Sequence, residues 1–162
     1  LAYELSRKGI DVLILEKERL PRYKACAGGI TVKTANLLGF DFSSVTRDTV
    51  RSAKVAYGAG RSFTKSYPEP LIHMVMRDEF DQLLVQRARE AGAALADNER
   101  VDQVRITEQG VKVETANRVF TARVTVGADG ARSTVAANPR CFALLPPRHP
   151  SLISSPDPAL KY

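Results

Sequence analysis

The stretch that decides the fold is VTVGADGARSTVA, residues 124–136. Its apolar residues 124–126 predict a strand, and residues 132–137 predict the start of a helix. Asp129 stands beside Gly130 at the turn between them. A carboxylate there can accept hydrogen bonds from sugar-like hydroxyls, and a helix N-terminus favours a nearby phosphate. The same pattern also fits a tight turn in which Asp129 only caps the helix, and both interpretations stay open.

Residues 1–137 alternate helix and strand patterns around that stretch. Amphipathic or capped segments predict the helices, and short apolar or alternating runs predict the strands. Together they predict an α/β fold, a partial Rossmann-like domain with an inserted antiparallel β-meander. The expected helices are residues 1–8, 31–38 and 78–91; the expected strands are residues 10–15, 50–57, 61–65 and 71–76, with the meander at 101–107, 111–115 and 118–123.

A helix, a glycine and a strand precede Glu16 in the order of a dinucleotide-binding unit. Residues 10–15 are mostly apolar, which suits a buried parallel strand, and Gly9 ends the helix before it. In such a unit an acidic residue ends the second strand and binds a ribose, about 20 residues after a glycine-rich phosphate loop. Counting about 20 residues back from Glu16 leads to a position before Leu1, so we expect the phosphate loop to precede this chain. An ordinary exposed glutamate is the alternative.

Two further segments contain candidate ligand-binding residues. Residues 21–29, PRYKACAGG, contain Cys26 and the pair Gly28 and Gly29, whose backbone can approach a flat ligand closely. Arg77 begins the helix of residues 78–91 and offers several donors to phosphate or carbonyl oxygens. The alternatives are a surface turn with an inert cysteine and an exposed arginine before a capped helix. Basic residues near the first segment also complement phosphate charge: Lys17, Arg19, Arg22 and Lys24.

The amino-acid composition limits the classes of protein to which this chain can belong. The 24 lysines and arginines exceed the 18 aspartates and glutamates, so the net charge is +6. The basic residues are scattered and accompany no aromatic-rich RNA-binding motif, which favours an anionic cofactor or substrate over nucleic acid. Two cysteines, Cys26 and Cys141, give neither a disulfide framework nor zinc spacing, so we expect no metal and a cytoplasmic location. His73 in its strand is expected to be structural.

The order and spacing of these segments resemble the FAD-binding part of the geranylgeranyl reductase family, which belongs to the flavoprotein group of the aromatic hydroxylases. The hydroxylase group shares the last matching stretch, whereas Lys24, Cys26, Gly28 and Gly29 are typical of the reductases. Ala27 stands where that family has glycine. The matching stretches are LAYELSRKGIDVLILEK, PRYKACAGGIT, VMRDEFDQLLVQRAREAGA and VGADGARSTVA.

The resemblance implies FAD as the cofactor and a role for each matching residue. Glu16 would bind the adenosine ribose, and Arg77 would contact the flavin cofactor. Asp129 would hold the ribityl or pyrophosphate region, with Gly130 allowing close approach. Near the isoalloxazine ring would lie Cys26, Gly28 and Gly29.

The implied function is FAD-dependent reduction of isoprenoid double bonds, as in geranylgeranyl groups of lipids or chlorophyll precursors. The implied partners are an isoprenoid substrate, either a diphosphate or lipid-linked, an external electron donor and the surface of a membrane. A flavin-dependent monooxygenase or halogenase of the same fold is one alternative. An inactive fragment that retains no cofactor is another.

The resemblance divides the chain into a partial FAD-binding domain, residues 1–137, and a proline-rich tail, residues 138–162. Six of the nine prolines fall in the tail, which we expect to be loop-like or disordered. The glycine loop would precede Leu1, and the rest of the flavin site would follow Ala137. We therefore expect the 162-residue chain by itself not to retain FAD.

Overall fold

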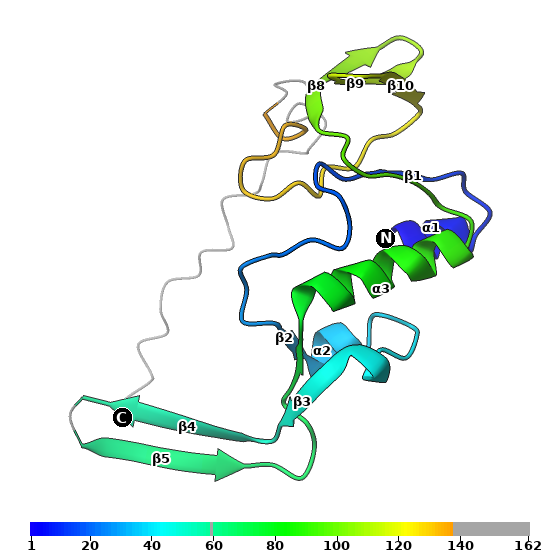
Figure 1. The fold of residues 1–162 in the computed structure, drawn as a ribbon. Helices are drawn as coiled ribbons and strands as arrows, with labels where there is room; N and C mark the ends of the chain where they lie inside the picture. Colours follow the sequence, from blue (N-terminus) through cyan, green and yellow to red (C-terminus); the bar gives the residue numbers. More distant parts are fainter. Residues whose placement is uncertain (59, 138–162) are drawn as a thin grey trace, which may run out of the picture. The chain divides into compact units, whose positions relative to one another are not determined.

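The structure is a computed structural model that describes residues 1–58 and 60–137. The expectations for residues 138–162 lie outside the described residues. The chain divides into two compact units, one from Leu1 to Glu99 and one that begins at Arg100 (Figure 1).

The first unit contains a parallel pair of strands beside two helices. Strand β1 (Leu13–Leu15) pairs in parallel with β7 (Ala94–Ala96), and helix α1 (Ala2–Ser6) packs against α3 (Arg77–Glu90). Gly9, which follows α1, has a φ of +75° that favours glycine. This confirms the expected α/β fold, with the helix–glycine–strand order leading to Glu16. The strand expected over residues 10–15 is shorter and is not buried as predicted, because Ile10 lies outside it and Leu13 is 43% exposed.

A three-stranded antiparallel sheet holds the main core of this unit. Its strand order is β2 (Gly29–Thr31), β6 (Ile72–Val75) and β3 (Thr46–Val50). The core consists of Phe42, Val75 and Phe80, and the rings of Phe42 and Phe80 meet edge to face at 5.9 Å between centroids. The ring of Phe42 also lies edge to face with the ring of His73, with 5.5 Å between their centroids, so His73 packs against this core.

Short elements connect β2 to β3. Helix α2 (Val32–Ala35) is shorter than the predicted span of residues 31–38, but the Thr31 hydroxyl caps it as expected by accepting from the Thr34 N–H at 3.3 Å. The 3₁₀ helix η1 (Ser43–Val45) follows and leads into β3. Sequence patterns do not predict strands β2 and β3, because neither shows the apolar alternation that identifies a half-buried strand.

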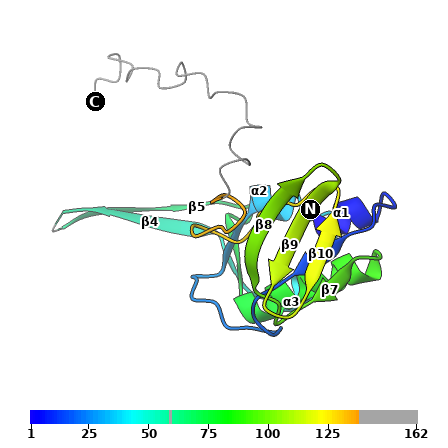
Figure 2. The same cartoon turned by 90° about the horizontal axis from the view of Figure 1, so that it is seen from above.

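The predicted hairpin is present as β4 (Ser52–Tyr57) and β5 (Arg61–Ser66). Figure 2 shows it as a thin two-stranded ribbon that extends away from the helices of the unit. Every residue of both strands is exposed. The pair therefore depends on backbone hydrogen bonds and cross-strand contacts, not on a buried face.

The second unit is built on the predicted β-meander. Strands β8 (Val101–Thr107), β9 (Gly110–Thr115) and β10 (Val119–Ala122) form an antiparallel sheet in the order β10-β9-β8 (Figure 2). Val104 and Val113 lie opposite each other across the sheet and are both buried. Their pairing supplies the apolar centre of this small sheet.

Two predictions for the stretch after the meander are wrong. Residues 124–126 form no strand, and residues 132–137 form turns instead of a helix. Val124 and Val126 are 75% and 58% exposed, so their β-branched side chains gain little from an extended conformation. Among the turns, the Ala137 N–H donates to the Ser133 carbonyl at 3.1 Å, one helical turn that does not continue.

Candidate functional site

Glu16 lies immediately after β1, at the carboxyl end of the parallel pair. Its N–H donates to the Ala96 carbonyl at 3.0 Å, and its carbonyl accepts from the Glu99 N–H at 2.9 Å. The backbone is therefore anchored to the end of β7. The Oε1 atom accepts from the Glu18 N–H at 3.1 Å, so the carboxylate is oriented as well. This is the strand end at which an acidic residue binds ribose in dinucleotide-binding units.

Arg22 joins Glu16 to helix α3. Its Nε lies 3.3 Å from Glu16 Oε2, and one terminal nitrogen lies 3.4 Å from Asp81 Oδ2. The Arg22 side chain is only 19% exposed, which reduces the screening of both ion pairs by water. Both contacts of Arg22 are ion pairs, since its buried Nε makes no hydrogen bond within the described residues.

Arg77 and Asp81 form a two-pronged ion pair within α3. Arg77 Nε donates to Asp81 Oδ1 at 2.8 Å, and Arg77 Nη2 donates to Asp81 Oδ2 at 2.9 Å. The two are four positions apart along the helix, so they are neighbours on one face of it. The paired Asp81 carboxyl raises the pKa of Arg77 above its already high ordinary value, which outweighs the opposing effect of burial. Arg77 is therefore a fixed cation at the first turn of α3.

Cys26 extends this set of contacts into the loop before β2. The Gly28 N–H donates to the Cys26 sulfur at 3.4 Å, and this hydrogen bond lowers the pKa of the thiol below its ordinary value. A hydrogen bond from the Arg77 side chain lowers that pKa further. The Cys26 side chain is exposed, so the thiol is accessible to solvent. A cation and an N–H group beside a cysteine favour the thiolate form.

The two glycines of the loop are packed against strand β6. Gly28 has a φ of +73°, and a Cβ atom there would lie 2.0 Å from the Val75 carbonyl oxygen. A Cβ on Gly29 would lie 3.1 Å from Ile72 Cγ2. The close approach at Gly28 is therefore made by the protein's own backbone. That the two glycines also lie near the flavin ring stays a prediction.

Asp129 and Gly130 belong to the second unit. Asp129 Oδ2 accepts from the Thr134 N–H at 2.7 Å and from the Val135 N–H at 3.5 Å, so the carboxylate closes the turn that follows it. Burial raises the pKa of Asp129, but hydrogen bonds from Ser133 and from nearby backbone N–H groups outweigh it, and the pKa lies below its ordinary value. Gly130 has a φ of +85° and open space where a side chain would be.

Five side chains from three segments thus form one connected set in the first unit. We call it the Glu16–Cys26 network. Sequence patterns single out Glu16, Cys26 and Arg77 separately and miss how Asp81 joins them. The spacing of Arg77 and Asp81 on a predicted helix is the signal that could have found it. The network consists of Glu16, Arg22, Asp81, Arg77 and Cys26.

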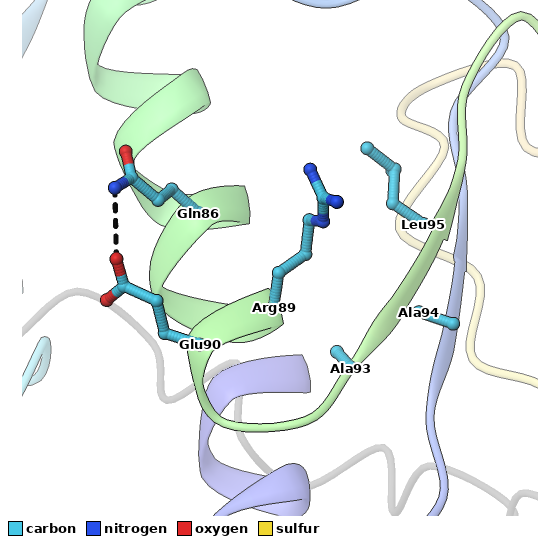
Figure 3. A pocket seen from close by; sticks show the side chains of 6 residues that line it. All are labelled: Gln86, Arg89, Glu90, Ala93, Ala94 and Leu95. Atoms are coloured by element: carbon cyan, nitrogen blue, oxygen red, sulfur yellow. Dashed lines mark hydrogen bonds between the residues drawn. The ribbon is translucent and has the colours of Figure 1, made fainter.

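A groove lies elsewhere on the same helix. Figure 3 shows its lining at the C-terminal end of α3, with the Arg89 side chain extended toward Leu95 and the Gln86 amide donating to Glu90 at 2.9 Å. Its volume is about 680 Å³. Arg77 begins the same helix, so the groove and the network lie at opposite ends of α3. Within residues 1–58 and 60–137, no group of histidine, cysteine or acidic residues is arranged to hold a metal.

A family model described as FAD binding domain matches residues 1–140. The chain belongs to this FAD-binding domain family. The match confirms FAD as the cofactor, as expected from the sequence. It does not distinguish reductases, monooxygenases and halogenases.

The curated relatives of this FAD-binding domain include an uncharacterized protein and a monooxygenase. An uncharacterized protein of Methanosarcina barkeri is 31% identical over 134 residues, which cover 83% of this chain and 35% of the relative. Rifampicin monooxygenase of Streptomyces venezuelae is 33% identical over 143 residues, which cover 83% of this chain and 30% of the relative. The chain therefore spans about a third of the length of these relatives.

Solved structures share the fold. The halogenase PltM, crystallised as a mutant in complex with FAD, matches at a TM-score of 0.67 and 19% identity, over 88% of this chain and 33% of its own. A geranylgeranyl bacteriochlorophyll reductase-like protein of Thermoplasma acidophilum matches at 0.62 and 19% identity, over 76% of this chain and 33% of its own. At these identities the likeness shows the fold of an FAD-binding domain.

The chemistry of the described residues fits FAD. Glu16 is an oriented carboxylate at the strand end where ribose hydroxyls are bound, and Arg77 is a fixed cation that can face an anionic or carbonyl group.

Among the described residues no helix is long and apolar enough to cross a membrane.

Proposed function

We propose that this FAD-binding domain serves a reductase of isoprenoid double bonds related to the geranylgeranyl reductases. The observation that supports this most directly is the Cys26 loop, because Cys26, Gly28 and Gly29 are the residues by which the sequence resembles the reductases. In the structure the side chain of Arg77, at the start of α3, lowers the pKa of the Cys26 thiol in this loop. The fold shared with the Thermoplasma acidophilum protein is consistent with this proposal.

Each residue has a proposed role toward the cofactor, which supplies hydride chemistry when bound. Glu16 accepts hydrogen bonds from the adenosine ribose, while Arg22 keeps its carboxylate oriented. Arg77 contacts the flavin, and the Cys26 loop lies beside the ring and shields it from water. Asp129 and Gly130 hold the ribityl or pyrophosphate part. The net charge of +6 favours an anionic isoprenoid such as a diphosphate, with an external electron donor and peripheral membrane contact as further parts of the proposal.

A monooxygenase is the second candidate function. The match to rifampicin monooxygenase favours this function. That relative is 33% identical to this chain and matches 83% of it, the same share that the uncharacterized protein matches at 31% identity. The two candidates differ in what happens to the substrate. A reductase adds hydrogen across a double bond, whereas a monooxygenase inserts an oxygen atom from O₂.

A chimera separates the two candidates. Residues 1–137 of this chain replace the matching third of the Methanosarcina barkeri relative, and the purified chimera is scanned for bound flavin. It is then reduced and incubated with geranylgeranyl diphosphate, and the product is analysed by mass spectrometry. We expect a gain of one pair of hydrogen atoms for each double bond reduced. Incorporation of labelled oxygen with consumption of O₂ would instead support the monooxygenase, and a chimera without flavin would contradict both.

A further inference from the structure

Asp81 is the point at which the Glu16–Cys26 network converges. It faces the Arg77 guanidinium at 2.8 and 2.9 Å and the Arg22 guanidinium at 3.4 Å. The residue is 9% exposed and is one of the buried positions of α3. A buried carboxylate is costly unless it is paired, and here two cations compensate one anion.

The helix explains why this position can orient its neighbours. Arg77 and Asp81 lie one turn apart on α3, and Phe80 and Ala88 bury the helix against the rest of the first unit. Asp81 therefore has little freedom to move. A long arginine side chain has many rotamers, and a two-pronged bond to a fixed carboxylate selects one of them. In the selected rotamer the Arg77 guanidinium lowers the pKa of the Cys26 thiol.

We propose that Asp81 is the positioning residue of the site: it holds Arg77 against the Cys26 loop and Arg22 against Glu16, so that both arginines are set before the cofactor binds. This inference rests on the proposed function, which gives Arg77 and Glu16 their roles toward FAD. Asp81 itself touches neither cofactor nor substrate in this scheme. It acts through the two arginines.

Two accounts of Asp81 make opposite predictions for Cys26. If Asp81 positions Arg77, its loss frees the guanidinium, the sulfur loses a donor, and the thiolate becomes harder to form. If Asp81 only neutralises charge, Arg77 stays in place with a less compensated positive charge, and the thiolate becomes easier to form. The other groups that act on Cys26, the Gly28 N–H and Lys24, are the same in both accounts.

The test measures the rate of Cys26 alkylation by iodoacetamide between pH 6 and pH 10, roughly the range in which cysteine thiols titrate. It uses the whole 162-residue chain with Cys141→Ser, so that one thiol reacts, and compares Asp81→Asn with the parent. Glu79→Gln is the matched control, because Glu79 is a carboxylate of the same helix that pairs with Arg47 outside the network. Circular dichroism checks that each variant is folded.

We expect Asp81→Asn to react about threefold more slowly at neutral pH, with a midpoint about half a pH unit higher than the parent. Glu79→Gln should match the parent. An unchanged or lower midpoint for Asp81→Asn overturns the proposal. If that variant does not fold, Asp81→Asn with Arg22→Gln removes one charge of each sign, and the same rise is expected of it.

An FAD titration separates this inference from the proposed function. The alkylation profile requires no cofactor, so it tests the positioning of Arg77 alone. In the chimera, we expect Asp81→Asn to raise the dissociation constant of FAD while Glu79→Gln does not. A chimera that binds FAD equally well with and without Asp81→Asn overturns the positioning role and leaves the proposed function intact. A chimera that binds no FAD contradicts the function and leaves the alkylation result to judge Asp81.

Discussion

Gly28 shows how one residue position determines the conformation of the Cys26 loop. Its φ is +73°, and a side chain there would meet the Val75 carbonyl oxygen at 2.0 Å. We predict that Gly28→Ala lowers the free energy of unfolding by roughly 2 kcal/mol or more, because left-handed strain and a backbone clash add together.

The control for that prediction is Gly9→Ala. Gly9 has a similar φ of +75° but open space around the missing Cβ, so only the strain of about 1–2 kcal/mol applies. Urea denaturation of both variants measures the difference. Equal losses of stability would show that the loop moves away from β6 at no cost.

The Asp129 carboxylate accepts a hydrogen bond from the Thr134 N–H and is also the residue proposed to bind the ribityl or pyrophosphate part of FAD. Its low pKa keeps the carboxylate ionised at neutral pH, ready to accept hydrogen bonds. We predict that Asp129→Ala in the chimera weakens FAD binding about 10- to 150-fold, from the roughly 1.5–3 kcal/mol of a hydrogen bond to a charged group.

The measurement for Asp129 is a fluorescence titration with FAD. Asp102→Ala is the control, because Asp102 is an exposed acidic residue of the same unit, 4.0 Å from Arg100. A folded Asp129→Ala variant with an unchanged dissociation constant would leave Asp129 with its turn-closing role alone.

At the scale of elements, the hairpin and the core sheet differ in what protects their backbone. Every residue of β4 and β5 is exposed, whereas β6 lies between two neighbouring strands and includes the buried Val75. A lone two-stranded pair is marginal in water. We predict that amides of β4 and β5 exchange with deuterium at least about 100-fold faster than those of β6.

Exchange followed by mass spectrometry on peptides of the intact chain tests this prediction. The meander strand β9 is the internal reference, since it is also central in its sheet. Protection of β4 and β5 equal to that of β6 would mean that another surface covers the hairpin in solution.

At the scale of the whole molecule, the division at Glu99 predicts an autonomous first unit. The core of Phe42, Val75 and Phe80 and the whole Glu16–Cys26 network lie before that boundary. We predict that residues 1–99 alone unfold cooperatively on heating and that Cys26 shows the same alkylation profile as in the full chain. Loss of a cooperative transition in the near-ultraviolet circular dichroism would contradict this, because a molten state has no fixed side-chain packing.

Much of this protein follows from local sequence. The helix of residues 78–91 and the three meander segments are predictable because apolar spacing and glycine punctuation act within a few residues. The strand expected over residues 10–15 is present only as Leu13–Leu15. The same local signals mark Glu16, Arg77 and the Cys26 loop as chemical positions. The strand predicted at residues 124–126 and the helix predicted at 132–137 are absent, because local propensity without a packing partner does not stabilise them. The elements predicted at residues 10–15 and 31–38 are present but shorter.

Tertiary structure decided the rest. Arg22 lies between Glu16 and Asp81 only because segments distant in the sequence pack together. The same packing lets Arg77, which is 51 positions after Cys26, lower the pKa of the Cys26 thiol. Only the fold shows that the space beside Gly28 is filled by the Val75 carbonyl. Periodicity and composition describe neighbours along the chain, whereas an ion-pair network depends on which side chains meet when distant segments pack. The sequence by itself thus determined the family's elements and candidate residues, and packing decided how those residues are joined.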